Sequence, residues 1–201
     1  MSASGPRVAV FASGSGSNFE AIARVAQTGK LKADIALLVC DKCEAGAISR
    51  AERLGVPSVC VKPADFPTKE AYEQRILQVL DDYQIQFVAL AGYMRLVGPT
   101  LLRPFEGRIV NVHPSLLPAH PGLNAIQRSF ESGEGGVTVH LVDSGMDTGP
   151  ILGQQTVEIV PGDSLETFEQ RLHSVEHALY PEVLQQLITQ YQITQQPTPG
   201  L

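Results

Sequence analysis

The distribution of apolar residues predicts alternating strands and helices over the first half of the chain. Several short apolar runs are continuous rather than alternating, which is typical of strands buried on both faces of a parallel sheet. Segments with helical periodicity separate these runs, and such an order predicts β-α-β units. The expected strands are 8–12, 35–40, 58–61, 87–91 and 108–112, and the expected helices are 18–27, 45–54 and 68–83.

The pattern changes after about residue 123. A helix is expected over 125–132, and the runs 137–142 and 151–159 alternate more regularly, so they indicate strands. Alternation favours antiparallel pairing, and we expect one of these strands to run against the others. A long helix is expected over 165–189, and Pro181 is a point where it could break, because proline removes a backbone donor.

These elements predict one α/β domain. We expect a Rossmann-like, mostly parallel twisted sheet with helices on both faces, an antiparallel edge strand and a long C-terminal helix. A length of 201 residues suits a single domain with a sizeable core. The domain is expected to span residues 1–190, and residues 191–201 are expected to form a disordered tail.

Composition is ordinary for a soluble globular protein, and a small phosphorylated substrate is compatible with it because backbone N–H groups can bind a phosphate. The hydrophobic content of 43% is ordinary, and the formal charge of 15 minus 21, or −6, comes without a basic run, so a nucleic-acid partner is not expected. No apolar stretch reaches the roughly 18 residues of a membrane span, and no signal peptide is recognisable. A cytoplasmic monomer or homodimer is expected.

The cysteines and two histidines are candidate metal ligands. Cys40 and Cys43 have the C-x-x-C spacing of redox or zinc sites, but no second such pair exists, and a structural zinc needs about four ligands. We therefore expect Cys40, Cys43 and Cys60 to be reduced thiols near a strand end. His173 and His177 are four residues apart without an evident third ligand, so we expect a packed or solvated helix face and no metal.

A Gly-rich turn links the first strand to the first helix. Gly14 and Gly16 permit close approach of a ligand, and the N–H groups of the following helix suit a phosphate. Phe19 occupies the place of the third glycine of a dinucleotide fingerprint, and no P-loop lysine follows. The alternative is a tight strand-to-helix connection without a ligand, but the place of the turn after the first strand favours a phosphate site.

Asn111, His113 and Asp147 are the strongest catalytic candidates. Asn111 and His113 are two residues apart on one strand, so both side chains are expected on one face at its carboxyl end. Asp147 lies in a Gly-rich loop that could fold over that end. An amide donor, an imidazole and a carboxylate are the groups that acyl transfer needs. Each of these residues, taken singly, could as readily have a structural role as a catalytic one, and the same holds for His140 on a later strand.

Five blocks of sequence resemble the phosphoribosylglycinamide formyltransferases. They are Ser-Gly-Ser-Gly-Ser-Asn at 13–18, Ala-Gly-Tyr-Met-Arg at 91–95, Asn-Val-His-Pro-Ser-Leu-Leu-Pro at 111–118, the segment 143–150, and Glu-His-Ala-Leu-Tyr-Pro at 176–181. The resemblance covers residues 7–190. It implies transfer of formyl from 10-formyltetrahydrofolate to the amine of glycinamide ribonucleotide, a step of de novo purine synthesis, and a cis bond before Pro118.

The resemblance also implies residue roles. Asn111 would bind the formyl oxygen, His113 would take part in proton transfer, and Asp147 would orient His113. The ribonucleotide would contact Gly16, Ser17, Asn18, Pro114 and Glu176. The folate would contact Lys69, Met94, Arg95, Val97, Val142, Asp143 and Met146. This chain departs from many relatives at Asn124, where they carry histidine.

The sequence leaves three alternatives open. A methionyl-tRNA formyltransferase would carry a further C-terminal domain and a basic surface. A formyltetrahydrofolate deformylase would transfer the formyl group to water and usually carries an N-terminal regulatory domain. A Rossmann-type nucleotide-binding module would use Asp41 to bind the ribose.

Overall fold

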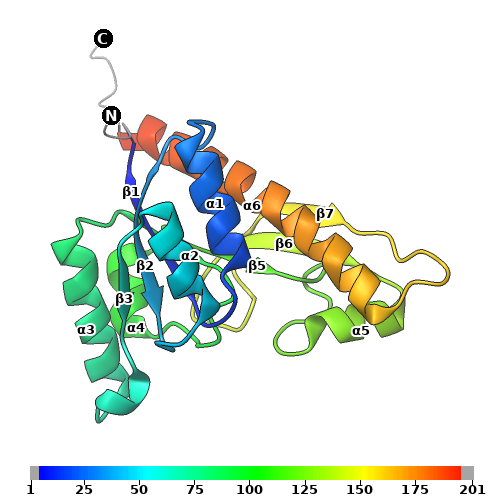
Figure 1. The fold of residues 1–201 in the computed structure, drawn as a ribbon, viewed down its shortest axis with the longest axis horizontal. Coiled ribbons are helices and arrows are strands. Elements are labelled where there is room, and N and C mark those ends of the chain that lie inside the picture. Colours follow the sequence, from blue (N-terminus) through cyan, green and yellow to red (C-terminus); the bar gives the residue numbers. More distant parts are fainter. Residues whose placement is uncertain (1–4, 196–201) are drawn as a thin grey trace.

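The computed structural model describes residues 5–195, which form a seven-stranded sheet flanked by helices (Figure 1). The strand order is β3-β2-β1-β4-β5-β6-β7. The strands are β1 (Arg7–Ala12), β2 (Asp34–Cys40), β3 (Ser58–Cys60), β4 (Phe87–Leu90), β5 (Ile109–His113), β6 (Gly136–Leu141) and β7 (Ile151–Thr156).

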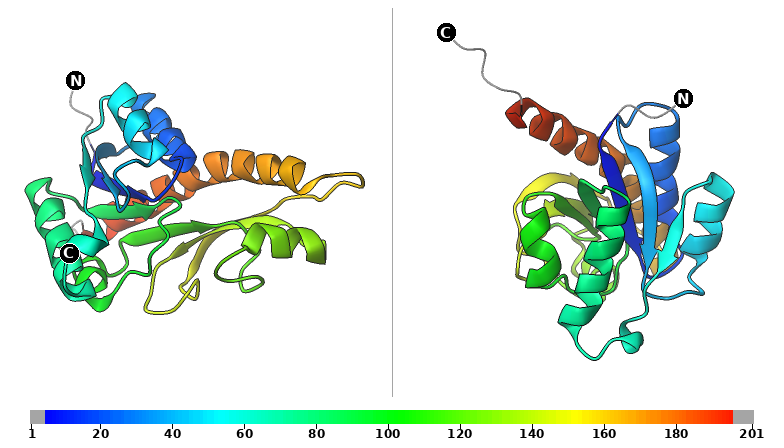
Figure 2. Two further views of the ribbon diagram at one scale, coloured as in Figure 1. Left: turned by 60° about the horizontal axis from the view of Figure 1, so that its bottom comes forward. Right: turned by 90° about the vertical axis from the view of Figure 1, so that its left-hand side faces the viewer.

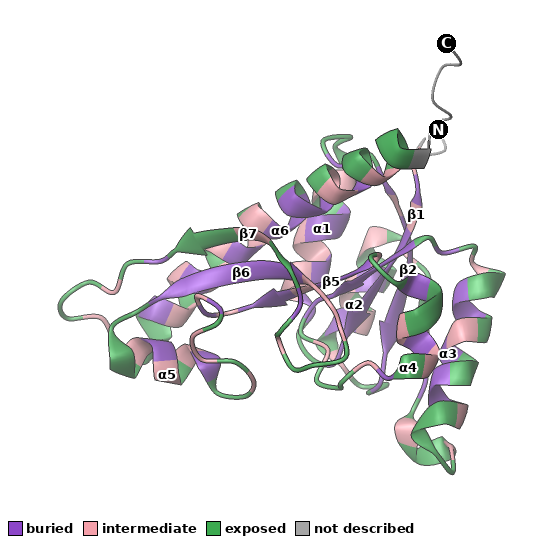
Figure 3. Cartoon of the chain, turned by 180° about the vertical axis from the view of Figure 1, so that it is seen from behind, coloured by how far each residue is buried: buried purple, intermediate pink, exposed green. Residues whose placement is uncertain are grey.

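The first five strands are parallel, and the last two add antiparallel pairs. β6 runs antiparallel to β5, and the edge strand β7 runs antiparallel to β6. The predicted fold class is confirmed. β1, β2 and β4 are almost wholly buried because helices cover both of their faces, whereas β7 is largely exposed at the edge (Figure 3).

The helices form two layers. α1, α2 and α6 pack on one face of the sheet, and α3 and α4 pack on the other (Figure 2). α5 packs against α6 through Phe130 and Phe168. The helices are α1 (Ser17–Gln27), α2 (Gly46–Leu54), α3 (Lys69–Asp82), α4 (Pro99–Leu102), α5 (Ala125–Ser132) and α6 (Leu165–Gln195), with 3-10 turns at Pro63–Asp65 and Arg103–Phe105.

α6 is one continuous helix of 31 residues, and it does not break at Pro181. A stripe of buried side chains runs through the proline, with Leu172 and Tyr180 before it and Leu184 and Ile188 after it. Packing on both sides therefore holds the helix together despite the lost backbone bond. α6 also continues to Gln195, beyond the residue 190 expected as the domain end, while residues 196–201 of the expected tail lie outside the described residues.

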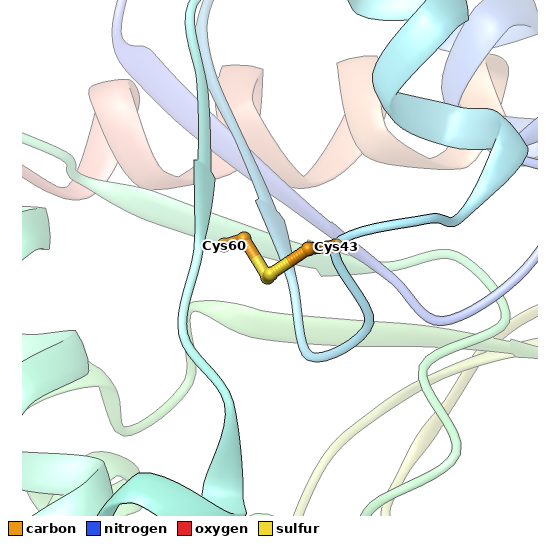
Figure 4. The surroundings of a disulfide bond; sticks show 2 residues. All are labelled: Cys43 and Cys60. Atoms are coloured by element: carbon orange, nitrogen blue, oxygen red, sulfur yellow. A yellow bond between two sulfur atoms is a disulfide. The ribbon is translucent and has the colours of Figure 1, made fainter.

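The expectation of three reduced thiols is wrong for Cys43 and Cys60, which form a disulfide with a Cα–Cα distance of 5.3 Å (Figure 4). Parallel pairing sets Cys60 of β3 beside Cys40 of β2, and the loop after β2 turns back to bring Cys43 to Cys60. Cys40 is a free thiol, and burial raises its pKa to about 11. The spacing of the cysteines could not show this pairing, because Cys60 is far from Cys43 in the sequence and reaches it only when β3 pairs with β2.

Removing the disulfide should destabilise the fold. It closes a loop with a sequence separation of 17, for which loss of the cross-link costs about 3 kcal/mol. For a chain of this size that corresponds to a fall in the thermal midpoint of roughly 6–12 °C. Calorimetry should show this fall for the Cys43→Ser/Cys60→Ser double variant and for the wild type treated with a small dithiol. The dithiol should leave the double variant unchanged, and a wild type that is insensitive to the dithiol would contradict a stabilising role.

Candidate active site

A cavity of about 890 Å³ opens at the carboxyl ends of the parallel strands. The cavity lies beside β1 and β4, two neighbouring strands from which the chain continues toward opposite sides of the sheet. Ligand sites of open α/β sheets typically lie at such a point. All of the site residues expected from the sequence line it except Lys69. Lys69 begins α3 and places its Nζ 3.9 Å from Glu73 Oε1. Asp41 is buried and does not line the cavity, which weighs against its role as a ribose-binding acid.

Asn111 and His113 are neighbours on one face of β5, as their spacing predicts. The antiparallel pairing of β5 with β6 places His140 directly opposite Asn111. Asn111 Nδ2 lies 3.2 Å from His140 Nε2. The site therefore contains a second imidazole beside the one expected.

His140 fixes the orientation of the Asn111 amide. His140 Nδ1 lies 2.9 Å from the Leu141 carbonyl oxygen, which can only accept, so Nδ1 carries the proton. His140 Nε2 then accepts one hydrogen of the Asn111 amide. The amide has a second hydrogen, which stays available to a ligand in the cavity. The sequence offered no signal for this role, because the register that pairs Asn111 with His140 is a property of the folded sheet.

His113 is held in one tautomer by the loop that follows β5. Its Nε2 donates to the His120 carbonyl oxygen at 2.9 Å, so the lone pair is on Nδ1. Nδ1 lies 3.4 Å from Asp147 Oδ2. Burial lowers the pKa of His113, while the His120 carbonyl and the Asp147 carboxylate oppose that shift. A neutral His113 can therefore accept a proton at Nδ1, and Asp147 stabilises the cation that results.

Asp147 lies in the loop between β6 and β7 with a left-handed backbone, at φ 56°. Its Oδ2 accepts from the Gly122 N–H at 2.8 Å, and its Oδ1 lies 3.6 Å from His140 Nε2. The neighbouring His140 side chain and the hydrogen bond from the Gly122 N–H lower the pKa of Asp147 to about 2, against the effect of burial. Asp147 is thus a fixed negative charge between two imidazoles.

The Gly-rich turn and α6 form the opposite end of the cavity. Gly16 has a left-handed backbone, at φ 77°, and is the N-cap of α1, so Ser17 and Asn18 belong to the first helical turn. Asn18 Nδ2 donates to Glu176 Oε2 at 2.9 Å, and His173 Nδ1 donates to the same oxygen at 2.8 Å. Glu176 is only 3% exposed, so it is a buried part of the cavity wall and not a surface charge.

Apolar side chains line the remaining wall. Met94 is 64% exposed, and Leu96 and Met146 are also exposed at the cavity. The Arg95 guanidinium lies over the Tyr72 ring, with its Cζ atom 5.4 Å from the ring centroid. Exposed apolar side chains around a cavity are typical of a surface that binds an apolar or flat ligand.

The loop 114–124 contains a cis peptide bond and ends at a residue with a left-handed backbone. The peptide bond between Leu117 and Pro118 is cis, as the resemblance implies. Asn124 lines the cavity and is the N-cap of α5 with a left-handed backbone, but its side chain makes no capping hydrogen bond.

Residues 6–184 match the formyl transferase family. The chain belongs to this family. It is 50% identical to the phosphoribosylglycinamide formyltransferase of Bacillus subtilis (strain 168), over 90% of this chain and 94% of the relative. It is 56% identical to glycinamide ribonucleotide transformylase 1 of Geobacillus kaustophilus, whose crystal structure matches 91% of this chain and 98% of that chain with a TM-score of 0.88. The family resemblance and the enzyme class expected from the sequence are confirmed.

Within residues 5–195, no group of three or more His, Cys, Asp or Glu side chains is arranged to hold a metal ion. None of the helices in the same part of the chain combines the length and apolarity needed to cross a bilayer.

The titration of His113 should depend on Asp147. Nuclear magnetic resonance should give His113 a pKa below its ordinary value of 6.5 in the wild type and a still lower one in Asp147→Asn, because the variant loses the charge that stabilises the histidinium. His173 is an internal control, since Glu176 raises its pKa, and it should titrate above 6.5 in both proteins. An unchanged His113 titration in the variant would show that Asp147 does not act on it.

Proposed function

We propose that this chain transfers the formyl group of 10-formyltetrahydrofolate to the primary amine of glycinamide ribonucleotide, giving N-formylglycinamide ribonucleotide and tetrahydrofolate in de novo purine synthesis. The observation that carries the proposal is the grouping of Asn111, His113 and Asp147 at one end of a cavity whose other end is a helix N-terminus suited to a phosphate. The names of its relatives in Bacillus subtilis and Escherichia coli support the same reaction.

The ribonucleotide occupies the end of the cavity formed by α1 and α6 in this proposal. The N–H groups of Gly16, Ser17 and Asn18 bind the phosphate, because the first turn of a helix leaves them without partners. Glu176 accepts from the ribose hydroxyls, and Pro114 shapes the glycinamide end of the site. The acceptor amine then lies toward Asn111 and His113.

The folate occupies the apolar wall. Its flat ring packs among Met94, Val97 and Val142, with Arg95, Asp143 and Met146 around it. Arg95 lies over Tyr72, which is on α3 one turn after Lys69. That placement supports contact of Lys69 with the acidic tail of the folate outside the cavity.

The proposed reaction proceeds through a tetrahedral intermediate. The amine nitrogen attacks the formyl carbon, and the free N–H of Asn111 stabilises the charge that builds on the formyl oxygen. His113 Nδ1 takes the proton that the nitrogen loses, and the ionised Asp147 stabilises the histidinium. The bond from the formyl carbon to folate N10 then breaks, and the proton is returned to N10 as tetrahydrofolate leaves.

The proposal includes a cytoplasmic location and no nucleic-acid partner. The formal charge of −6 weighs against a tRNA acceptor, which needs a basic surface. The Cys43–Cys60 disulfide is unusual for that location, because the cytosol of most organisms keeps thiols reduced. A monomer or homodimer is proposed.

A formyl-transfer assay tests the proposal. Release of the folate product from 10-formyl-dideazafolate should require glycinamide ribonucleotide, and His113→Ala should lose most of the turnover. Release without any acceptor would identify a hydrolase instead. Absence of release under both conditions would reject the transfer reaction.

Asn111→Ala should reduce turnover more than binding. Loss of one donor to the developing oxyanion typically costs about 3–4 kcal/mol, so kcat should fall roughly 10²- to 10³-fold while KM for each substrate changes little. Asn124→Gly is a matched control, because it removes another amide from the cavity and glycine tolerates the left-handed backbone there. An unchanged kcat in Asn111→Ala, or an equal fall in both variants, would remove Asn111 from the mechanism.

A further inference from the structure

The Gly-rich turn is supported from outside the cavity by α2. The Ala47 N–H donates to the Gly14 carbonyl oxygen at 3.1 Å, and Arg50 Nε donates to the Ser15 carbonyl oxygen at 2.8 Å. The next carbonyl, of Gly16, accepts from the Glu20 N–H at 2.9 Å within α1. Three successive carbonyl groups of the turn are therefore fixed, two of them by α2.

Fixing a carbonyl group also fixes the N–H of the next residue. A trans peptide is planar, with its C=O and N–H on opposite sides. The Ser15 oxygen points toward Arg50, so the Gly16 N–H points away from α2. Gly16 lines the cavity, and its N–H donates to no acceptor within residues 5–195. The bond from Arg50 thereby orients a free donor for an anion in the cavity.

The turn has little other support at this point. Gly14 and Ser15 are exposed, and a Cβ atom added to Gly14 would meet nothing within 4 Å. Gly16, in contrast, is closely packed, because an added Cβ atom would lie 2.5 Å from the Cβ atom of Ala47. Packing thus fixes the end of the turn, and Arg50 is the side chain that fixes the exposed peptide before it.

Arg50 is itself held by an ion pair with Glu20, through its Nη1 and the Glu20 Oε2. Arg24 binds the other oxygen of Glu20 at 2.8 Å. Hydrogen bonds from Arg50 and Arg24 lower the pKa of Glu20. Arg53, one turn of α2 away, lies 3.9 Å from Glu20 and makes no hydrogen bond to the turn in the described part of the chain. Arg50 and Arg53 share a helix and a carboxylate partner, but only Arg50 reaches the turn.

We infer that Arg50 is a positioning residue for the acceptor's phosphate: by holding the Ser15 carbonyl, it aims the Gly16 N–H at the phosphate of the ribonucleotide. This inference rests on the proposed function for the identity of the acceptor. Arg50 does not contact the phosphate in this arrangement and acts through the peptide between Ser15 and Gly16. Its planar guanidinium suits the role, because Nε bonds the carbonyl while Nη1 bonds Glu20, and the single ammonium group of lysine cannot reproduce that pair of directions.

The test compares two acceptors that differ only in the phosphate. For Arg50→Ala, kcat/KM with glycinamide ribonucleotide should fall about 10- to 100-fold, mainly through KM. This is the loss expected when the charge-assisted hydrogen bond from the Gly16 N–H to the phosphate is no longer formed. With glycinamide riboside, which lacks the phosphate, kcat/KM should stay within about threefold of the wild type, and so should KM for the formyl donor. Arg50→Lys should also lose affinity for the ribonucleotide, because it keeps the charge but not the geometry.

Arg53→Ala is the matched control and should behave as the wild type with both acceptors. Thermal midpoints of all variants show whether the fold is intact, and Arg50→Lys provides the test if Arg50→Ala does not fold. An equal loss with ribonucleotide and riboside, or no loss with either, would overturn the role of Arg50. Calorimetric affinities of wild type and variant for the ribonucleotide keep the two hypotheses separate. If the wild type binds the ribonucleotide without formylating it, the proposed function is rejected. The ratio of the wild-type and Arg50→Ala affinities for the ribonucleotide still decides whether Arg50 positions the phosphate site.

Discussion

β1 and β4 lie side by side in the sheet, and the chain continues from them toward opposite neighbours, β2 and β5. Both strands are parallel, so both end at the same edge, and the turns that follow them must separate. The two turns stay joined at their bases, where the Ser13 N–H donates to the Gly92 carbonyl at 3.1 Å and Ser13 Oγ accepts from the Met94 N–H at 2.9 Å. The cavity, with the N-terminus of α1 at one end and an apolar wall, follows from this divergence.

The arrangement of the catalytic candidates depends on a second constraint, the reversal of chain direction at β6. Because β6 is antiparallel to β5, its carboxyl end does not lie at the edge with the others, and His140 comes to lie opposite Asn111. The connection from β6 to the edge strand β7 then carries Asp147 back to the two histidines. A sheet of parallel strands alone would supply Asn111 and His113 but no carboxylate between imidazoles.

Much of this architecture is predictable from local sequence. The continuous apolar runs gave the positions of the strands because burial on both faces leaves no polar position to interrupt them. The pair Asn111 and His113 was predictable from strand periodicity, and Asp147 was a candidate because its Gly-rich loop could fold over the end of that strand. Contacts set by strand order or register were not predictable, namely the bond from Cys43 to Cys60, the pairing of His140 with Asn111 and the support of the Gly-rich turn by Arg50. The short helix α4 was missed because its four residues are too few to show a period.

Tyr180 on α6 is fully buried, and its hydroxyl lies 2.9 Å from the Leu90 carbonyl oxygen and 3.1 Å from that of Val110. These two hydrogen bonds fix α6 against β4 and β5, and Glu176 lies one helical turn from Tyr180. The side of the cavity proposed to bind the ribonucleotide is therefore a rigid template, whereas the side proposed to bind the folate is made of exposed, conformationally adaptable side chains such as Met94 and Met146. Selectivity should be unequal between the two substrates: an altered sugar or phosphate meets a surface that cannot adjust, while an altered ring system meets one that can be remodelled around it.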